Sequence, residues 1–381
     1  MIEQSEGAKL KVKEKYTSAP SDNREEASAR SKEARQEKTI GIINKVLGFI
    51  LTTVILIGIA GLGVEYVLVR GPSPALRDTF VMTMLETRRF GFMANVFLSD
   101  EEVAEIKTRN TSQRAEEMDS SLINIPSQGQ EGTEGEAGSA PAAMDYGLVD
   151  EDGDGIIIDQ VVKKLCTGYM MIVQDPSRVF VGKPNNFGGS GLSVEGMCLK
   201  YDAIGGINGG GFFDDGGAGL GGEPTGLTVS EGVYYNEYSG TDCFIGFDED
   251  GILHIGYMNA EDAHASNIRD GVTFSYGPIL VSNGMPVDAT GIITGMNPRT
   301  AIGQRADGAV LMLVIDGRQA QSAGATYADL TEIMLDYGAV NACNLDGGSS
   351  TAMWFDGEYV NNSATTPRAL PTCFLVRKEG A

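Results

Sequence analysis

Two apolar segments that each end in Asp-Gly constrain the fold of this chain more than any other feature. Residues 310–317 (VLMLVIDG) begin with a continuous apolar run, as expected for a strand buried on both faces. Residues 341–348 (NACNLDGG) repeat the pattern with a second glycine. Between them, Thr326 and Asp329 have the spacing of a helix capping pair, and Gly338 stands where a helix should stop. The stretch predicts a strand, a helix and a second strand parallel to the first.

Parallel strands bring the residues at their carboxyl ends to one edge of the sheet. Asp316 and Asp346 should therefore lie at the same edge, about 5 Å apart on adjacent strands or about 10 Å apart on next-but-one strands. These separations bracket those of the carboxylate pairs used in glycosyl transfer. The N-terminus of the helix near Thr326 would offer free N–H groups to an anion at that edge.

Asp-Gly after a strand is also ordinary turn chemistry, and for either aspartate alone this is the simpler interpretation. Arg299, Arg318 and Ser349 lie close to the two aspartates in sequence and favour a site. Residues 297–303 are expected to be the hairpin partner of the 310–315 strand. Arg299 would then stand at the start of that partner strand, and arginine binds phosphate or carboxylate with two parallel hydrogen bonds.

A second unusual stretch is rich in glycine. Residues 207–215 (INGGGFFDD) and the following loop to residue 226 predict a backbone that approaches a ligand closely, with Asn208 aimed at it. Phe212 or Phe213 would serve as a stacking platform for a sugar ring. The alternative is a long connecting loop. No Gly-Lys-Ser/Thr follows, so this is not a phosphate-binding P-loop.

Composition divides the chain into segments of different character. We expect a disordered cytoplasmic tail (1–39), a transmembrane helix (40–69), a juxtamembrane amphipathic or stalk segment (70–106), an acidic linker rich in Gly, Ser and Glu (107–149), and one mixed α/β (α+β), strand-rich catalytic domain (150–381).

The transmembrane prediction rests on residues 46–64, nineteen positions without a charge. A cleaved signal peptide is the main alternative, but the polar region before the run is too long and no small-residue cleavage site follows. Basic residues concentrate on the N-terminal side of the run, which predicts a single-pass protein of the cell membrane with an extracellular C-terminal domain. They are Lys32, Arg35, Lys38 and Lys45, against Arg70 and Arg77 beyond it.

The chain carries a formal net charge of −23, which makes nucleic acid a poor partner. His254 and His264 are its two histidines, and neither lies in a glycine-rich or acidic motif. A Ser-His-Asp triad and a histidine-ligated zinc site are therefore not expected, and we predict no metal among the site residues.

Residues 150–155 (DEDGDG) resemble the opening of a calcium loop, but position twelve is Val161 instead of a bidentate Glu. We expect a hydrophilic turn there and no required cofactor, with calcium as the alternative. The five cysteines lack metal-ligand spacing, and they allow one disulfide but no disulfide scaffold.

The domain resembles the phosphodiester glycosidase family, and the matching stretches occur in the family's order from about residue 165 to the C-terminus. They are residues 208–214 (NGGGFFD), 277–281 (GPILV), 283–284 (NG), 299–303 (RTAIG), 316–318 (DGR), 324–326 (GAT), 344–350 (NLDGGSS) and Arg368. The chain looks most like membrane-anchored bacterial versions linked to exopolysaccharide.

The resemblance implies hydrolysis of a sugar-1-phosphodiester. One of Asp316 and Asp346 would be the general acid or base and the other the nucleophile or oxocarbenium stabiliser, with Arg299 and Arg368 holding the phosphate. Asn208 is expected to take part with these groups by orienting sugar and phosphate oxygens. The other expected substrate-binding residues are Arg318, Thr326, Asn344, Gly347, Gly348, Ser349, Ser350, Gly209, Gly210 and Phe212.

Two functions of other classes stay open. One is a surface carbohydrate-binding or wall-anchoring module without turnover, in which acidic loops hold calcium that bridges to a glycan. The other is a transferase that moves a sugar-phosphate to a wall polymer.

Overall fold

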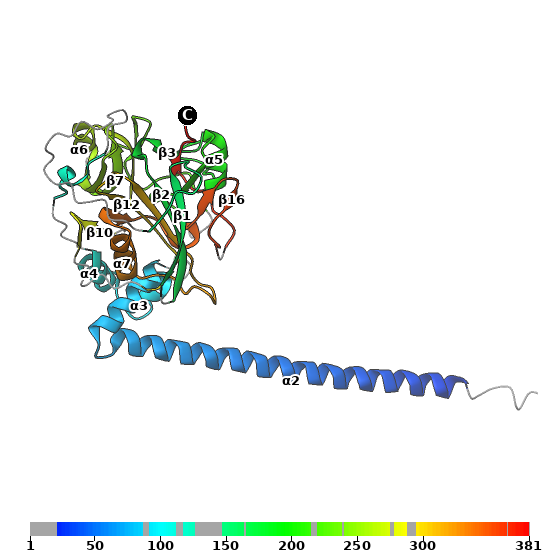
Figure 1. Cartoon of the computed structure of the whole chain (residues 1–381). Coiled ribbons are helices and arrows are strands. Elements are labelled where there is room, and N and C mark those ends of the chain that lie inside the picture. Colours follow the sequence, from blue (N-terminus) through cyan, green and yellow to red (C-terminus); the bar gives the residue numbers. More distant parts are fainter. Residues whose placement is uncertain are drawn as a thin grey trace, which may run out of the picture. The chain divides into compact units, whose positions relative to one another are not determined.

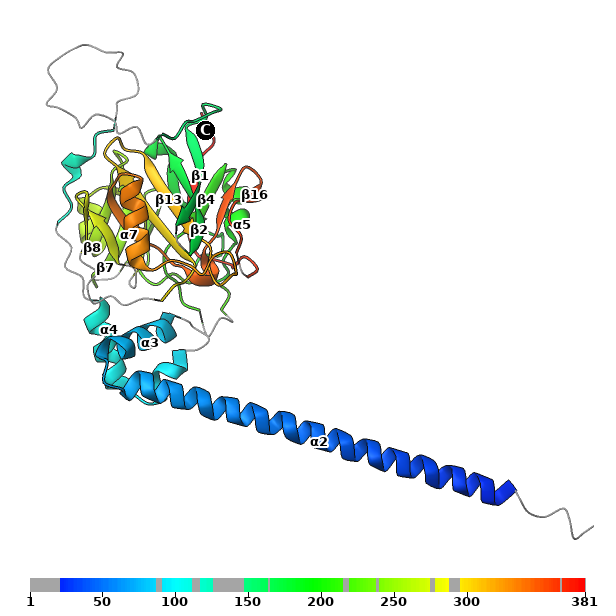
Figure 2. The same cartoon turned by 60° about the horizontal axis from the view of Figure 1, so that its bottom comes forward.

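The computed structural model describes residues 21–86, 91–111, 117–125, 147–163, 165–214, 219–237, 240–274, 278–287, 295–363 and 365–380 (Figure 1 and, turned by 60°, Figure 2). The chain divides into two compact units, Met1–Gly71 and Pro72–Ala381. Parts of several expected features lie outside the described residues: the tail to residue 20, the juxtamembrane segment at 87–90, the linker at 112–116 and 126–146, the glycine-rich loop at 215–218, and residue 277 of the 277–281 stretch.

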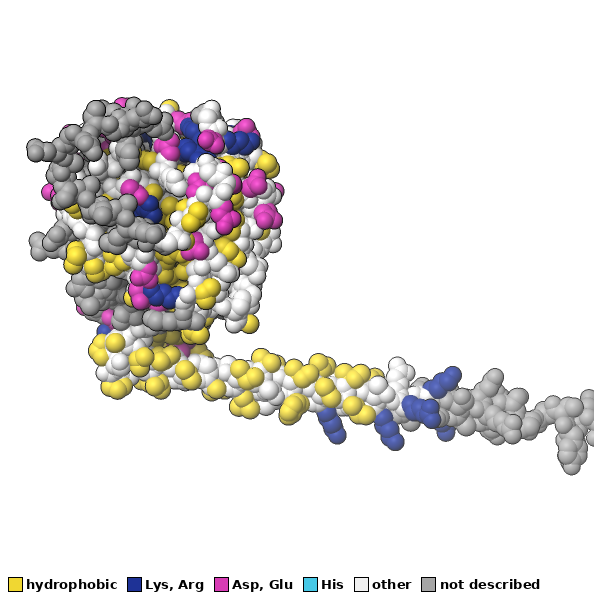
Figure 3. Space-filling view, viewed as in Figure 1, with side chains coloured by type: hydrophobic (Ala, Val, Ile, Leu, Met, Phe, Trp, Pro, Cys, Tyr) yellow, Lys and Arg dark blue, Asp and Glu magenta, His cyan; other side chains and the backbone are white. Residues whose placement is uncertain are grey.

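The first unit contains one long helix, α2 (Ser21–Arg70). It begins well inside the tail that we expected to be disordered, because residues 21–38 are rich in the strong helix formers Ala, Glu, Arg and Lys. Its segment Lys38–Arg70 is long and apolar enough to cross a membrane. Figure 3 shows apolar side chains along this segment and Lys and Arg side chains toward its N-terminal end. The segment is consistent with a membrane anchor or a signal sequence.

The second unit begins with three short helical elements where we expected a stalk. These are α3 (Pro74–Glu86), η1 (Gly91–Asn95) and α4 (Asp100–Thr111). Helix α3 packs against both η1 and α4. Val81 and Val103 are buried in this cluster, whereas Leu76 and Phe92 are exposed, so only part of its apolar surface is covered by protein.

Part of the expected linker lies against the domain. Residues 117–125 include η2 (Ser120–Leu122), and the backbone N–H of Asp119 donates to the side-chain oxygen of Asn283 across 2.8 Å. The N–H of Asn124 donates to the carbonyl of Ala306 across 2.7 Å. This stretch is held by specific hydrogen bonds and does not behave as a free spacer.

Three sheets make up the rest of the unit, and every described strand pair in them is antiparallel. The seven-stranded sheet has the order β1 (Ile156–Lys163), β2 (Cys166–Val173), β13 (Val310–Ile315), β12 (Arg299–Arg305), β14 (Ala339–Asn344), β10 (Ile279–Ser282) and β11 (Met285–Pro286). A five-stranded sheet has the order β16 (Glu358–Tyr359), β15 (Met353–Phe355), β4 (Gly205–Asn208), β17 (Cys373–Val376) and β3 (Val179–Gly182). The other has the order β6 (Val233–Tyr235), β5 (Thr228–Ser230), β9 (Ile268–Thr273), β7 (Asp242–Asp248) and β8 (Leu253–Met258). The fold is mixed α/β and rich in strands, as predicted.

The three sheets share one central core, and a helix covers the outer side of each. Strand β13 shows how the sequence builds this arrangement. Val310, Met312 and Val314 face the shared core, while the alternate residues pack on the side of α7 (Tyr327–Asp336). The apolar run is therefore buried on both faces, as predicted. Helices α5 (Val194–Tyr201) and α6 (Ala260–Ala265) cover the other two sheets.

The predicted unit of strand, helix and strand is present as β13, α7 and β14. Both strands are antiparallel to β12, which lies between them, so they are parallel to each other and next-but-one in the sheet. Strand β12 is also the predicted hairpin partner of β13, with Arg299 opposite Ile315. Thr326 and Asp329 form the predicted capping box at the start of α7.

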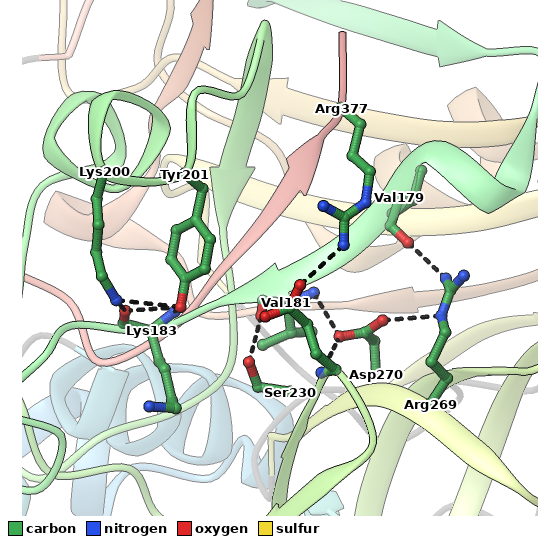
Figure 4. A network of polar contacts seen from close by, with 10 residues as sticks. Val179, Val181, Lys183, Lys200, Tyr201, Ser230, Arg269, Asp270 and Arg377 are labelled. Atoms are coloured by element: carbon green, nitrogen blue, oxygen red, sulfur yellow. Dashed lines mark hydrogen bonds and ion pairs between the residues drawn. The ribbon is translucent and has the colours of Figure 1, made fainter. Parts of the chain in front are cut away.

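A buried carboxylate joins two of the sheets (Figure 4). Asp270 of β9 accepts hydrogen bonds from the backbone N–H groups of Val181 in β3, across 3.0 Å, and of Glu231, across 2.9 Å. Its other oxygen lies 2.9 Å from Nε of Arg269. Burial raises the pKa of Asp270, and the two backbone hydrogen bonds oppose that rise. Ser230 adds a 2.8 Å bond to the carbonyl of Val181.

Candidate active site

A pocket lies where β13 ends, walled by the loops that follow β13, β14 and β16. Its enclosed space is small, with a volume of about 10 Å³, which is roughly the room that one water molecule needs. The lining residues are Pro298, Asp316, Gly317, Arg318, Gly348, Ser349, Thr351, Asn361, Ser363 and Thr365. Four of the expected site residues thus meet here: Asp316, Arg318, Gly348 and Ser349.

Asp316 is the carboxylate of this pocket, and its residue surface is 7% exposed. One carboxylate oxygen accepts a hydrogen bond from Nδ2 of Asn361 across 3.0 Å. The other accepts from the backbone N–H of Asn362 across 3.2 Å. Burial raises the pKa of Asp316, and the two hydrogen bonds only partly oppose this rise. Asp316 thus keeps a proton to higher pH than an ordinary aspartate does.

The loop that carries Asn361, Ser363 and Thr365 was missed by the sequence analysis. It follows the short strand β16 and reaches Asp316 from a distant part of the chain. The available clue was a pair of asparagines after a strand, a pattern that more often marks a turn.

Asp346 follows β14 at the same edge of the sheet as Asp316, but it is not among the residues that line the pocket. Its residue surface is half-buried. Its backbone carbonyl accepts a hydrogen bond from Nδ2 of Asn208 across 2.6 Å, and its N–H donates to the carbonyl of Gly209 across 3.4 Å. Of the two expected catalytic aspartates, the pocket therefore presents Asp316.

The glycine-rich stretch packs against other parts of the protein at the positions where we expected it to contact a ligand. The N–H groups of Gly209 and Gly210 donate to the carbonyl and hydroxyl of Thr372, each across 3.1 Å. A Cβ atom added to Gly210 would lie 2.5 Å from the carbonyl oxygen of Thr273. These glycines are required by the close approach of neighbouring strands and loops.

Phe212 also packs inside the protein. It is 4% exposed, and the guanidinium of Arg368 lies 5.1 Å from its ring centre. Arg368 forms an ion pair with Asp214 and donates from Nη1 to the hydroxyl of Ser349 across 3.3 Å. Arg368 therefore reaches the pocket through Ser349. Phe213, the neighbouring aromatic residue, is 59% exposed.

The other two expected arginines differ in their surroundings. Arg299 is buried, donates to the carbonyls of Ala325 and Gly295, and lies 4.2 Å from the ring centre of Tyr327. Arg318 lines the pocket, although one of its nitrogens also donates to the side-chain oxygen of Asn297 across 3.1 Å. Arg318 is thus the guanidinium of the pocket wall.

Thr326 and Asn344 hold local structure. The hydroxyl of Thr326 accepts a hydrogen bond from the N–H of Asp329 as the cap of α7. Asn344 is buried, and its Nδ2 donates to the carbonyl of Leu345 across 2.6 Å.

Gly347, Gly348 and Ser350 shape the turn after β14. A Cβ atom on Gly347 would meet the carbonyl oxygen of Pro298 at 2.8 Å, and the N–H of Gly348 donates to that same oxygen. Gly348 has a φ of 64°, which glycine adopts readily. Ser350 is buried. The turn therefore brings Gly348 and Ser349 to the pocket wall.

The carboxylates of Asp150, Asp152 and Asp154 lie within 4.8 Å of one another, a grouping that could hold a cation. Each also accepts a hydrogen bond from a backbone N–H of the same turn, as in the N–H of Ile156 to Asp154 across 2.8 Å. These bonds fit the expected hydrophilic turn.

Neither histidine lines the pocket. His254 lies 2.8 Å from a carboxylate oxygen of Asp248, and His264 lies 3.4 Å from one of Glu237. All five cysteines are free and buried, and Sγ of Cys243 is 3.8 Å from Sγ of Cys343. In the pocket, Asp316 is the lining group best suited to proton transfer.

Residues 201–377 match the family described as phosphodiester glycosidase, and this range contains every expected site residue. The uncharacterized protein YomE of the SPbeta prophage in Bacillus subtilis is 31% identical over 199 residues, covering 49% of this chain. The chain spans 29% of the length of that relative.

The catalytic domain of zebrafish N-acetylglucosamine-1-phosphodiester alpha-N-acetylglucosaminidase, auto-inhibited by its pro-peptide, has a related fold. The match has a TM-score of 0.50 at 21% identity and covers 59% of this chain and 82% of that one.

Proposed function

We propose that this chain, whose residues 201–377 form a phosphodiester glycosidase family domain, hydrolyses the bond between the anomeric carbon of a sugar and a phosphodiester. One observation carries the proposal. A buried carboxylate, Asp316, lines a small pocket together with the guanidinium residue Arg318 and the hydroxyl residue Ser349, inside the matched range.

The lining groups suit this chemistry. Arg318 would bind the phosphate, since it lines the pocket and arginine matches phosphate oxygens well, whereas Arg299 and Arg368 are not among the lining residues. A phosphomonoester is a good leaving group without being protonated. The reaction therefore depends more on an ionised carboxylate near the anomeric carbon than on a general acid that protonates the leaving group. Asp316 in its ionised form would activate water or stabilise positive charge at the anomeric carbon. Asp346 would be the second carboxylate.

The test uses the full chain in detergent micelles. UDP-N-acetylglucosamine and the methyl-phosphate diester of α-N-acetylglucosamine are incubated with the wild type, Asp316→Asn and Asp346→Asn. We expect the wild type to release free sugar and Asp316→Asn to release none. Binding without release would support the carbohydrate-binding alternative, and transfer to an added glycan acceptor would support a transferase.

We further propose that the substrate is an extracytoplasmic glycan or cell-envelope polymer, reached by a domain that the segment Lys38–Arg70 anchors in the membrane. The basic residues before this segment support a cytoplasmic N-terminus. A cysteine introduced as Ser5→Cys should react with a membrane-impermeant maleimide only after cells are permeabilised. Labelling in intact cells would contradict this orientation.

A further inference from the structure

We propose that Asn361 is a positioning residue for Asp316, which it holds in one orientation and whose ionised form it favours. The catalytic part of this inference rests on the proposed function. The structural part, that Asn361 controls the protonation of Asp316, can be tested without turnover.

The amide of Asn361 is held in one orientation by its two partners. Its Oδ1 accepts a hydrogen bond from the backbone N–H of Met353 across 2.8 Å. A backbone N–H can only donate, so Oδ1 must face Met353 and the NH₂ group must face Asp316. Asn361 is 6% exposed and thus cannot turn to exchange these partners for water. Asp316 consequently always meets a donor on this side.

The other carboxylate oxygen of Asp316 is held by the residue next to Asn361. The backbone N–H of Asn362 donates to it across 3.2 Å. Asn362 is itself held by Gln319 through a pair of bonds: Nδ2 of Asn362 donates to Oε1 of Gln319 across 3.1 Å, and Nε2 of Gln319 donates back to the carbonyl of Asn362. These two hydrogen bonds between Gln319 and Asn362 join the loop after β13 to the loop after β16. Both oxygens of Asp316 therefore accept hydrogen bonds from two adjacent residues of one loop.

The charges around the carboxylate leave Asp316 without a second carboxyl group in the pocket lining. Among the lining residues Asp316 supplies the one carboxyl and Arg318 the one cation. Arg368 approaches through Ser349 with its charge paired to Asp214, and Arg299 faces backbone carbonyls. In the part of the chain that the structure describes, the groups that bond to the Asp316 carboxylate are the amide of Asn361 and the N–H of Asn362, and no carboxylate is among them. An aspartate at position 361 would place one about 3 Å away, and two carboxylates that close cannot both ionise at ordinary pH.

The experiment compares Asn361→Asp and Asn361→Ala in the full chain in detergent micelles. Asn361→Asp keeps the oxygen that accepts from Met353, so it preserves that structural bond. Asn186→Asp is the matched control, because the same substitution then falls on an exposed loop residue whose amide donates to Ser190. The pH profiles of kcat and KM are measured for each variant.

For Asn361→Asp we expect the acid limb of the kcat profile to move up by about 1–3 pH units. Asn361→Ala should lower kcat by about tenfold or more with a smaller change in KM, as expected when a group that orients the reacting carboxylate is lost. The Asn186→Asp profile should match the wild type. An Asn361→Asp profile that also matches the wild type would overturn the proposal.

A second measurement separates this inference from the proposed function. Carbodiimide attacks protonated carboxyl groups, so labelling of Asp316 at a series of pH values, read by peptide mass spectrometry, reports its protonation directly. We expect the labelling midpoint to rise in Asn361→Asp and in Asn361→Ala relative to the wild type. A wild type without hydrolase activity but with these shifts would reject the proposed function and retain the role of Asn361. Unchanged midpoints in both variants would reject that role.

Discussion

Nδ2 of Asn208 donates to the backbone carbonyl of Asp346 across 2.6 Å, which joins two residues that the sequence analysis expected to act on substrate. The side-chain oxygen of Asn208 accepts from the hydroxyl of Thr300 across 2.7 Å and from the N–H of Ala352 across 3.2 Å. With all these bonds inside the protein, Asn208 is a cross-link between β4, β12 and the turns around Asp346.

Asn208→Ala should therefore act first on stability. It removes two buried hydrogen bonds and one part-buried hydrogen bond and leaves their partners unsatisfied, for an expected loss of about 2–4 kcal/mol in the free energy of unfolding. Urea unfolding of the full chain measures this loss. A variant of normal stability without activity would show instead that Asn208 touches the substrate.

Asp316→Asn should change the pH dependence of stability in a defined direction. Because the pKa of Asp316 is raised on folding, the native wild type binds the extra proton, and its stability falls as pH rises from the unfolded pKa of about 3.9 through the folded pKa. The variant lacks this titration. Its stability relative to the wild type should therefore improve between pH 4 and pH 7 in thermal melts. A difference that stays constant with pH would mean that burial of Asp316 does not shift its pKa.

Thr351→Val is expected to stabilise the protein and weaken turnover. Thr351 lines the pocket and is 2% exposed, and its hydroxyl oxygen has no hydrogen-bond partner in the part of the chain that the structure describes. Removing a buried hydroxyl of this kind should raise the free energy of unfolding by about 1 kcal/mol.

The matched control for that experiment is Thr300→Val. Thr300 is equally buried, but its hydroxyl donates to Asn208, so this variant should lose about 1–2 kcal/mol. Chemical denaturation of both variants gives the comparison. A loss of stability in Thr351→Val would assign its hydroxyl a structural bond.

Asp214→Asn should weaken the hold on Ser349 in the pocket wall, although Asp214 itself does not line the pocket. The Asp214 side chain is fully buried and pairs with Arg368, whose other nitrogen donates to Ser349. Without the carboxylate Arg368 keeps a partly buried charge and loses its anchor, at an expected cost of about 1–3 kcal/mol in stability. Since Ser349 then loses its fixed donor, KM should rise more than kcat falls. Unchanged stability and KM would show that Arg368 is held by other contacts.

The parts of the fold that were predicted correctly carry local signals. The apolar run at 310–315 is buried on both faces, and Thr326 with Asp329 begins α7. Both features could be predicted because strand burial and helix capping depend on residues that are close together in the sequence. Their combination predicted the edge at which Asp316 lies. The hairpin with Arg299 followed from short-range pairing in the same way.

Long-range contacts were the part that could not be predicted. Glycines at 209 and 210 indicate that something approaches the backbone, but they do not say whether it is a ligand or, as here, Thr372. Asn361 lies in a polar stretch without a motif, and only the pairing of β15 with β4 and β16 brings it beneath Asp316. Residues 117–125 were predicted to be part of a linker because their hydrogen-bond partners, Asn283 and Ala306, are distant in sequence.

The position of β17 has a consequence for how the protein is made. This strand, the last one described in the chain, lies between β3 and β4, and β4 otherwise pairs only with the late strand β15. During translation both edges of β4 therefore stay unpaired until the ribosome has added β15 and β17. Asn208 likewise meets the Asp346 carbonyl only after that segment has emerged. This sheet can therefore be completed only after β17 has emerged, and a nascent chain stalled before residue 373 exposes open strand edges that invite aggregation.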